Sequence, residues 1–148
     1  MQMSGLYFNH MHPQLHQYFT STLCHANAQH LSSNLFPLLV FGKLVEEEMG
    51  GWGLLLCYAL CGILANVASI IFLPSSTLGL GASGAVFGLF TIAVWEKLKM
   101  EVAITAKGGI AGVNHVAHLG GAFAGFAIVL FLRLIIAAFE RPSLRSSR

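Results

Sequence analysis

The sequence predicts an all-α fold, a polytopic bundle of transmembrane helices. Of its 148 residues, 55% are hydrophobic and only 9% are charged, whereas a soluble domain carries about 25% charged residues. So few polar side chains cannot cover a surface that faces water, and a lipid bilayer removes the need for them. The length fits a single domain. The formal charge of +2 is too small to indicate a nucleic-acid partner.

Four apolar stretches give the number of membrane helices. They cover residues 31–45, 51–73, 78–95 and 116–139. The second contains no charged residue, and at about 1.5 Å per residue it can cross roughly 30 Å of hydrocarbon. Residues 96–113 are predicted to form a mixed linker before the fourth stretch. We therefore predict about four membrane helices.

These stretches divide the chain into three regions. Residues 30–139 are predicted to form the membrane domain, and residues 1–29 a polar, amphipathic lead-in that contains no Lys or Arg. Residues 140–148 are predicted to form a basic, disordered tail. Because cytoplasm-like membrane faces collect Lys and Arg, we expect the lead-in to lie outside and residue 97 inside.

The charge rule conflicts with the number of crossings near the C-terminus. Lys97, Lys99 and Lys107 precede the last apolar stretch, and arginines follow it in the tail. One crossing cannot leave both of its flanks on the same side of the membrane. We therefore expect that a crossing is missing between the third and fourth stretches. The last helix should still insert, with its tail reversed, because leaving it in water would expose a large apolar surface.

Three polar motifs interrupt the apolar stretches. Ser83 lies in a G-x-S-G segment that opens the third stretch. His118 lies near the start of the fourth, where an ionisable group in a membrane helix usually serves a functional site. His30 and Asn34 are four residues apart, so a helix places them on one face.

Taken in order, the patterns H-x-x-x-N, G-x-S-G and A-H-x-x-G-x-x-x-G resemble those of the rhomboid family of intramembrane serine proteases. The resemblance covers about residues 15–98 and 112–139. It implies a six-helix core that acts in the bilayer on transmembrane segments of other proteins, without a metal or cofactor. It also implies that Ser83 is the nucleophile and His118 the base.

The chemistry of peptide hydrolysis agrees with these roles. The reaction needs a nucleophile, a base and hydrogen-bond donors for the oxyanion. The chain contains no Asp, which excludes a Ser-His-Asp triad and leaves a dyad. His30 and Asn34, together with the backbone N–H of Ser83, are the expected oxyanion donors. His115 is expected to be either a linker residue or a residue that supports the site, without a catalytic role of its own.

A set of glycines is predicted to let the serine and histidine helices approach each other. Small residues four apart allow the backbones of membrane helices to come into close contact. The predicted helix-packing motif comprises Gly81, Gly84, Gly88, Gly121 and Gly125. Close contact of these helices would bring the serine to the histidine.

The chain departs from the six-helix pattern of the family at two places. We expect it to lack the family's first helix and the helix between the serine and histidine helices. Residues 99–113 would reach only about 22 Å as a helix, short of a membrane span. Ser83 and His118 would then start on opposite sides of the membrane, which would separate the dyad. Truncation, alternative splicing and a faulty gene model would each explain this pattern.

Two other functions fit the sequence. A catalytically inactive rhomboid-like protein would bind transmembrane clients between its helices with the same fold. A histidine-rich metal transporter would use His10, His12 and His16, which we instead expect to be solvated polar residues. The resemblance is closer to organellar rhomboids and implies a plastid or mitochondrial membrane. No pattern in the sequence specifies the substrate or the oligomeric state.

Overall fold

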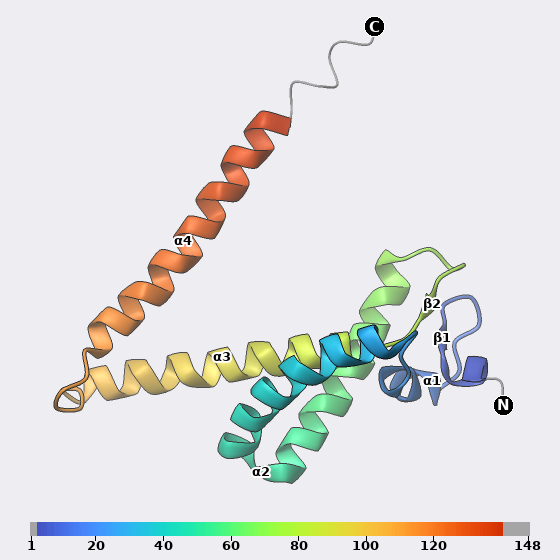
Figure 1. The fold of residues 1–148 in the computed structure, drawn as a ribbon, viewed down its shortest axis with the longest axis horizontal. Helices are drawn as coiled ribbons and strands as arrows, with labels where there is room; N and C mark the ends of the chain where they lie inside the picture. The colour runs from blue at the N-terminus through green and yellow to red at the C-terminus, as the bar shows by residue number, and fades with distance from the viewer. Residues whose placement is uncertain (1–2, 141–148) are drawn as a thin grey trace, which may run out of the picture. The chain divides into compact units, whose positions relative to one another are not determined.

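The computed structural model describes residues 3–140, which fold almost entirely as helices (Figure 1). The prediction of an all-α fold is confirmed. The contacts divide the chain into two compact units, one ending at Glu96 and the other starting at Lys97. The predicted tail falls largely outside the described residues. The elements are η1 (Met3–Leu6), β1 (Phe8–Asn9), α1 (Gln17–Thr20), η2 (Ser21–Leu23), α2 (Ala28–Phe72), β2 (Leu78–Gly79), α3 (Ser83–Ala106) and α4 (His115–Glu140).

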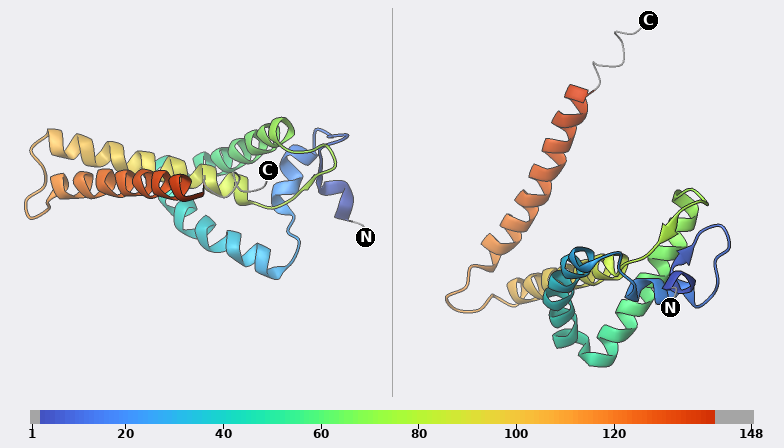
Figure 2. Two further views of the ribbon diagram at one scale, coloured as in Figure 1. Left: turned by 90° about the horizontal axis from the view of Figure 1, so that it is seen from above. Right: turned by 45° about the vertical axis from the view of Figure 1, so that its right-hand side comes forward.

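The first two predicted stretches form the two arms of α2. The arms meet at Gly50, whose φ of 73° is not helical and is readily adopted only by glycine. Figure 1 and both views of Figure 2 show the chain reversing at this point. The helix begins with an N-cap, because the side-chain oxygen of Asn27 accepts a hydrogen bond from the His30 N–H at 2.8 Å.

The first half of α3 packs against both arms of α2. Leu89 and Ala93 of α3 are buried with Val45 of the first arm. On the second arm the contact is closer, because a Cβ atom on Gly84 would overlap Ala65 and one on Gly88 would overlap Cys61. Glycine is therefore required at both positions for this approach of the two backbones.

The lead-in folds onto the ends of these helices. β1 pairs with β2 in antiparallel register, with Phe8 opposite Gly79. The expectation of a solvated His10 was wrong, because its ring is buried. Its Nδ1 donates to the Thr77 carbonyl oxygen at 2.9 Å, and its Nε2 lies 2.8 Å from the Ser69 hydroxyl oxygen. Hydrogen bonds to Ser69 of α2 and to Thr77 in the turn that follows explain why a polar residue is inside.

The predicted linker is wrong over its first half, because α3 continues to Ala106. Residues 96–106 are rich in Glu, Lys, Leu, Met and Ala, which favour a helix even where the chain is too charged for a membrane core. Gly108, Gly109 and Gly112 then adopt φ values of 94°, 77° and 82° and form the turn into α4. A composition that is unsuitable for a membrane span can therefore still favour a helix.

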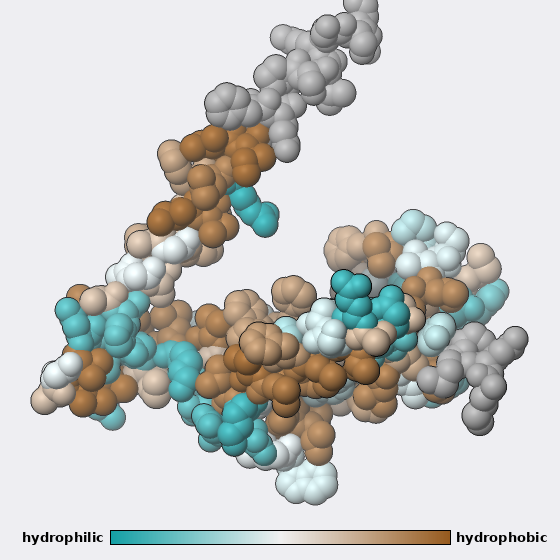
Figure 3. Space-filling model, viewed as in Figure 1, coloured by the Kyte–Doolittle hydropathy of each residue, from teal (hydrophilic) through white to brown (hydrophobic). Residues whose placement is uncertain are grey.

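Two helices among the described residues are long and apolar enough to cross a membrane, α2 and the His115–Arg133 part of α4. The apolar part of α3 ends at Trp95, where a charged segment begins. Many large apolar side chains on α2 and α4 are exposed, and hydrophobic residues dominate the visible face of these helices in Figure 3. Lipid is the solvent that such faces require.

A matched pair of alanine substitutions tests the packing of α3 on α2. Gly88→Ala should destabilise the protein by about 1–3 kcal/mol, the usual cost of overpacking, because the new methyl group meets Cys61. Gly121→Ala should be neutral or stabilising, since the described residues leave open space there and alanine favours a helix. Thermal unfolding in detergent measures both. A loss of stability from Gly121→Ala equal to that from Gly88→Ala would show that α4 packs through its glycines as well.

The order of the helices predicts where the ends of the chain lie. If each arm of α2, α3 and α4 crosses once, as the four apolar stretches predict, the C-terminus returns to the side of the lead-in. Single cysteines at His12, which is exposed, and at Ser146 should therefore react with a membrane-impermeant maleimide from the same side of sealed vesicles. The background lacks Cys24, Cys57 and Cys61. Reaction from opposite sides would contradict four crossings.

Candidate functional site

Ser83 is the first residue of α3 and is exposed. The backbone before it is held in place by two hydrogen bonds. The Gly81 N–H donates to the Ser21 carbonyl oxygen at 2.9 Å, and the Ala82 N–H donates to His25 Nε2 at 3.3 Å. The first N–H groups of a helix have no acceptor within the helix. The Ser83 N–H is therefore directed out of α3 next to its own hydroxyl.

Two hollows open beside Ser83. The first, of about 340 Å³, is almost entirely apolar and lies between the first arm of α2 and the start of α3. Its lining residues are Ser33, Asn34, Pro37, Phe41, Ser83, Val86, Phe87 and Phe90. The second, of about 370 Å³, is more polar and includes His30, Ser83 and Gly84. The structure thus brings Ser83 together with Asn34 on one side and with His30 on the other.

The side chains of His30 and Asn34 are both fixed by the first turns of α2. Asn34 is buried, and its Nδ2 donates to the His30 carbonyl oxygen at 2.8 Å. His30 Nδ1 accepts from the Ala26 N–H at 3.4 Å, so the neutral ring carries its proton on Nε2. The ring lies against Gly81, where a Cβ atom would come within 2.8 Å of Nε2. The Nε2 donor therefore lies close to the backbone that leads into Ser83.

His25 is a residue of this region to which sequence reasoning assigned no role. Its ring lies edge-on to that of His30, with centroids 5.1 Å apart, and its Nε2 accepts the hydrogen bond from the Ala82 N–H. Desolvation lowers the pKa of His25, and the neighbouring charge of His30 lowers it further, against a backbone hydrogen bond with Leu23. The neutral ring that accepts from Ala82 is thereby favoured. A polar segment directly before an apolar stretch was the only signal in the sequence.

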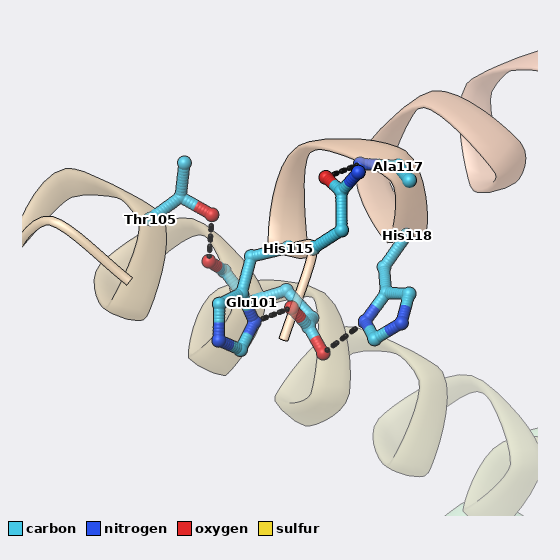
Figure 4. A network of polar contacts seen from close by, with 6 residues as sticks. Glu101, Thr105, His115, Ala117 and His118 are labelled. Carbon is cyan, nitrogen blue, oxygen red and sulfur yellow. Dashed lines mark hydrogen bonds and ion pairs between the residues drawn. The ribbon is translucent and has the colours of Figure 1, made fainter. Parts of the chain in front are cut away.

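His118 lies in the second unit and has a different partner. The Glu101 carboxylate, near the end of α3, accepts a hydrogen bond from His115 Nδ1 at 2.6 Å and one from His118 Nδ1 at 3.2 Å (Figure 4). These bonds, first that from His115 and then that from His118, lower the pKa of Glu101. Asn114 caps α4 by accepting from the Ala117 N–H at 2.9 Å.

The sequence did not indicate Glu101, and it left His115 either in the linker or as a residue that supports the site. His115 instead opens α4 and is buried, with 6% of its surface exposed. The spacing of His115 and His118, three residues apart at the start of a helix, was the available signal, because such residues share a face. Helical spacing could not indicate Glu101, because its contact with the two histidines depends on the conformation of the turn between α3 and α4.

The glycines of the predicted helix-packing motif lie in two different environments. Gly84 and Gly88 contact the second arm of α2. Around Gly121 and Gly125 the described residues leave space for a Cβ atom with nothing within 4 Å. Ser83 and His118 lie in different units, so their approach stays a prediction.

Comparisons with known proteins identify a family of helical membrane proteins. The model of the Rhomboid domain matches residues 12–107, a range that includes His30, Asn34 and Ser83 and ends before His118. The chain belongs to the rhomboid family and is a membrane protein. No solved structure matches it.

Relatives include plant and bacterial proteins. Rhomboid-like protein 11, chloroplastic, of Arabidopsis thaliana is 42% identical over 88% of this chain and 57% of its own length. The putative rhomboid protease YdcA of Bacillus subtilis is 30% identical over 74% of this chain and 63% of its own length. The rhomboid protease AarA of Providencia stuartii is 27% identical over 80% and 56%. The chain thus spans little more than half the length of these relatives.

The alignment with the Arabidopsis protein also shows an internal difference. It extends over 159 residues, more than the 148 residues of this chain. The relative therefore has residues, within the aligned region, that this chain lacks.

Proposed function

We propose that this chain is an intramembrane serine endopeptidase, with Ser83 as nucleophile and His118 as base. One observation carries the proposal. An exposed serine at the head of an apolar helix lines two hollows, an apolar one that includes Asn34 and a more polar one that includes His30. Relatives named as rhomboid proteases support the same reaction class.

The surroundings of Ser83 suit acyl transfer. Its hydroxyl would attack a peptide carbonyl carbon while the base takes the proton and later returns it to the leaving amine. Water would then release the acyl group from Ser83. The developing oxyanion would accept hydrogen bonds from the Ser83 N–H, His30 Nε2–H and the Asn34 amide. The N-terminal end of α3 adds its partial positive charge.

The apolar hollow indicates the kind of substrate. Phe41, Phe87 and Phe90 line it together with few polar atoms, so an extended apolar peptide would lose little by leaving lipid for this surface. A transmembrane segment of another protein meets that requirement. The backbone of the segment would have to unwind there, because Ser83 needs an accessible carbonyl group.

The base is the incomplete part of the proposal. Glu101 holds His118 through Nδ1, which fixes the tautomer that leaves Nε2 free to accept a proton. Glu101 is near the C-terminal end of α3, however, whereas Ser83 is its first residue. The extra residues of the Arabidopsis relative support an internal deletion. An additional crossing between α3 and α4 would bring His118 to the Ser83 side of the membrane.

The contact of His118 with Glu101 favours a second function. A chain whose histidine is held there would keep the hollow beside Ser83 and lose the base. It would bind transmembrane segments without cutting them. Either function would be carried out in an organellar membrane, a proposal supported by relatives named as chloroplastic and mitochondrial.

Covalent labelling separates the two functions. With a fluorophosphonate probe in detergent, the peptidase should label at Ser83 and lose the label in Ser83→Ala. Ser33→Ala is the matched control, because Ser33 lines the same hollow but opens no helix. Label that persists in Ser83→Ala, or that disappears in Ser33→Ala, would refute the assignment of the nucleophile. No labelling in a folded chain would favour the client-binding function.

Insertion of the absent crossing between Met100 and Gly112 tests the roles of the other residues. In that longer chain, His118→Ala should abolish turnover of a transmembrane substrate. Asn34→Ala should reduce the rate by about 10²–10³, the usual cost of one oxyanion donor, because Ser83 and His30 still donate. Equal and complete loss from both variants, with unchanged thermal unfolding, would mean that Asn34 does more than donate a hydrogen bond.

A further inference from the structure

The cluster of Glu101, His115 and His118 has the composition of a metal site. Each residue offers one ligand atom, and these atoms all lie within 4.8 Å of one another. In a tetrahedral zinc site with metal–ligand bonds of about 2.0–2.2 Å, ligand atoms are roughly 3.3 Å apart. Small side-chain rotations would therefore close this cluster around an ion. We propose that Glu101, His115 and His118 bind a divalent transition-metal ion, and that this ion is Zn²⁺.

The local structure positions these ligands before any ion arrives. His115 and His118 face the same side of the first turn of α4, which Asn114 caps. The Thr105 hydroxyl donates to the Glu101 carbonyl oxygen at 2.8 Å and lies on the next turn of α3. The turn between the helices also contributes, because a Cβ atom on Gly109 would touch the His115 ring at 3.4 Å. Both helix ends and the turn thus hold the three side chains together.

The burial of His115 fixes the atom that it offers to an ion. Only 6% of the residue is exposed, and its Nδ1 lies 2.6 Å from Glu101 Oε2. Its Nε2 is buried on the other side of the ring, without a hydrogen-bond partner among the described residues (Figure 4). An ion between the three side chains would therefore bind His115 through Nδ1, in place of the present hydrogen bond to Glu101.

The ligand types limit the choice of ion. Two imidazoles and one carboxylate suit Zn²⁺ and similar first-row ions rather than Mg²⁺ or Ca²⁺, which prefer oxygen ligands. Three protein ligands leave a fourth position for water. Binding would replace the hydrogen bonds of Glu101 by bonds to the ion and would join α3 to α4.

The proposed site goes beyond the peptidase proposal and competes with it. His118 cannot serve both as a ligand beside Glu101 and as the base for Ser83. Binding of the ion can be measured directly on the chain, without turnover. The outcome for the metal site is therefore separate from the outcome for the nucleophile.

Cobalt spectroscopy and zinc titration test the site. The full chain, purified in detergent without Cys24, Cys57 and Cys61, should bind one equivalent of Co²⁺ with the visible absorption of a tetrahedral site. Zn²⁺ should displace it and raise the unfolding temperature. Glu101→Gln should weaken binding by at least about tenfold and abolish the rise in temperature, while its circular dichroism stays unchanged.

Two further variants make the result decisive. His115→Ala should weaken binding as Glu101→Gln does, whereas His12→Ala is the matched control and should leave it unchanged, because His12 is exposed in the lead-in. Equal affinity in wild type and Glu101→Gln would overturn the proposal. So would the absence of stoichiometric Co²⁺ binding, or a loss of binding in His12→Ala, which would move the site to the lead-in.

Discussion

The close approach of α3 to the second arm of α2 is the contact on which the Ser83 region depends. Gly84 and Gly88 allow it because any side chain there would overlap Ala65 or Cys61. Ser83 directly precedes Gly84, so the same contact fixes where the serine emerges. The lead-in then completes the region, since Ser21 and His25 hold the backbone of residues 81 and 82. A packing requirement and a candidate nucleophile thus share one end of one helix.

The turn between α3 and α4 is the second constraint. It is short and rich in glycines with positive φ, and the chain must therefore enter α4 next to the end of α3. His115 and His118 meet Glu101 for this reason. A longer connection would free the start of α4 from Glu101. In the structure described, the length of this turn therefore sets the partner of both histidines.

This dependence links the two proposals physically. An imidazole can act as a base only where its free nitrogen reaches the nucleophile, and as a metal ligand only where other donors converge. The residues that would support the base lie around Ser83, and the donors that converge on His118 lie around Glu101. The two proposals therefore require different surroundings for the same side chain.

The sequence by itself determined the all-α fold, the apolar stretches and the polar residues placed at their ends, because hydrophobic length and helical spacing are local properties. It also indicated that His30 and Asn34 share a face of one helix. Only the tertiary structure decided that His10 is buried, that Gly84 and Gly88 face α2, and that Glu101 meets both histidines. Each of these depends on segments far apart in the chain. The linker was misjudged because charge excludes a residue from lipid but does not prevent it from forming a helix.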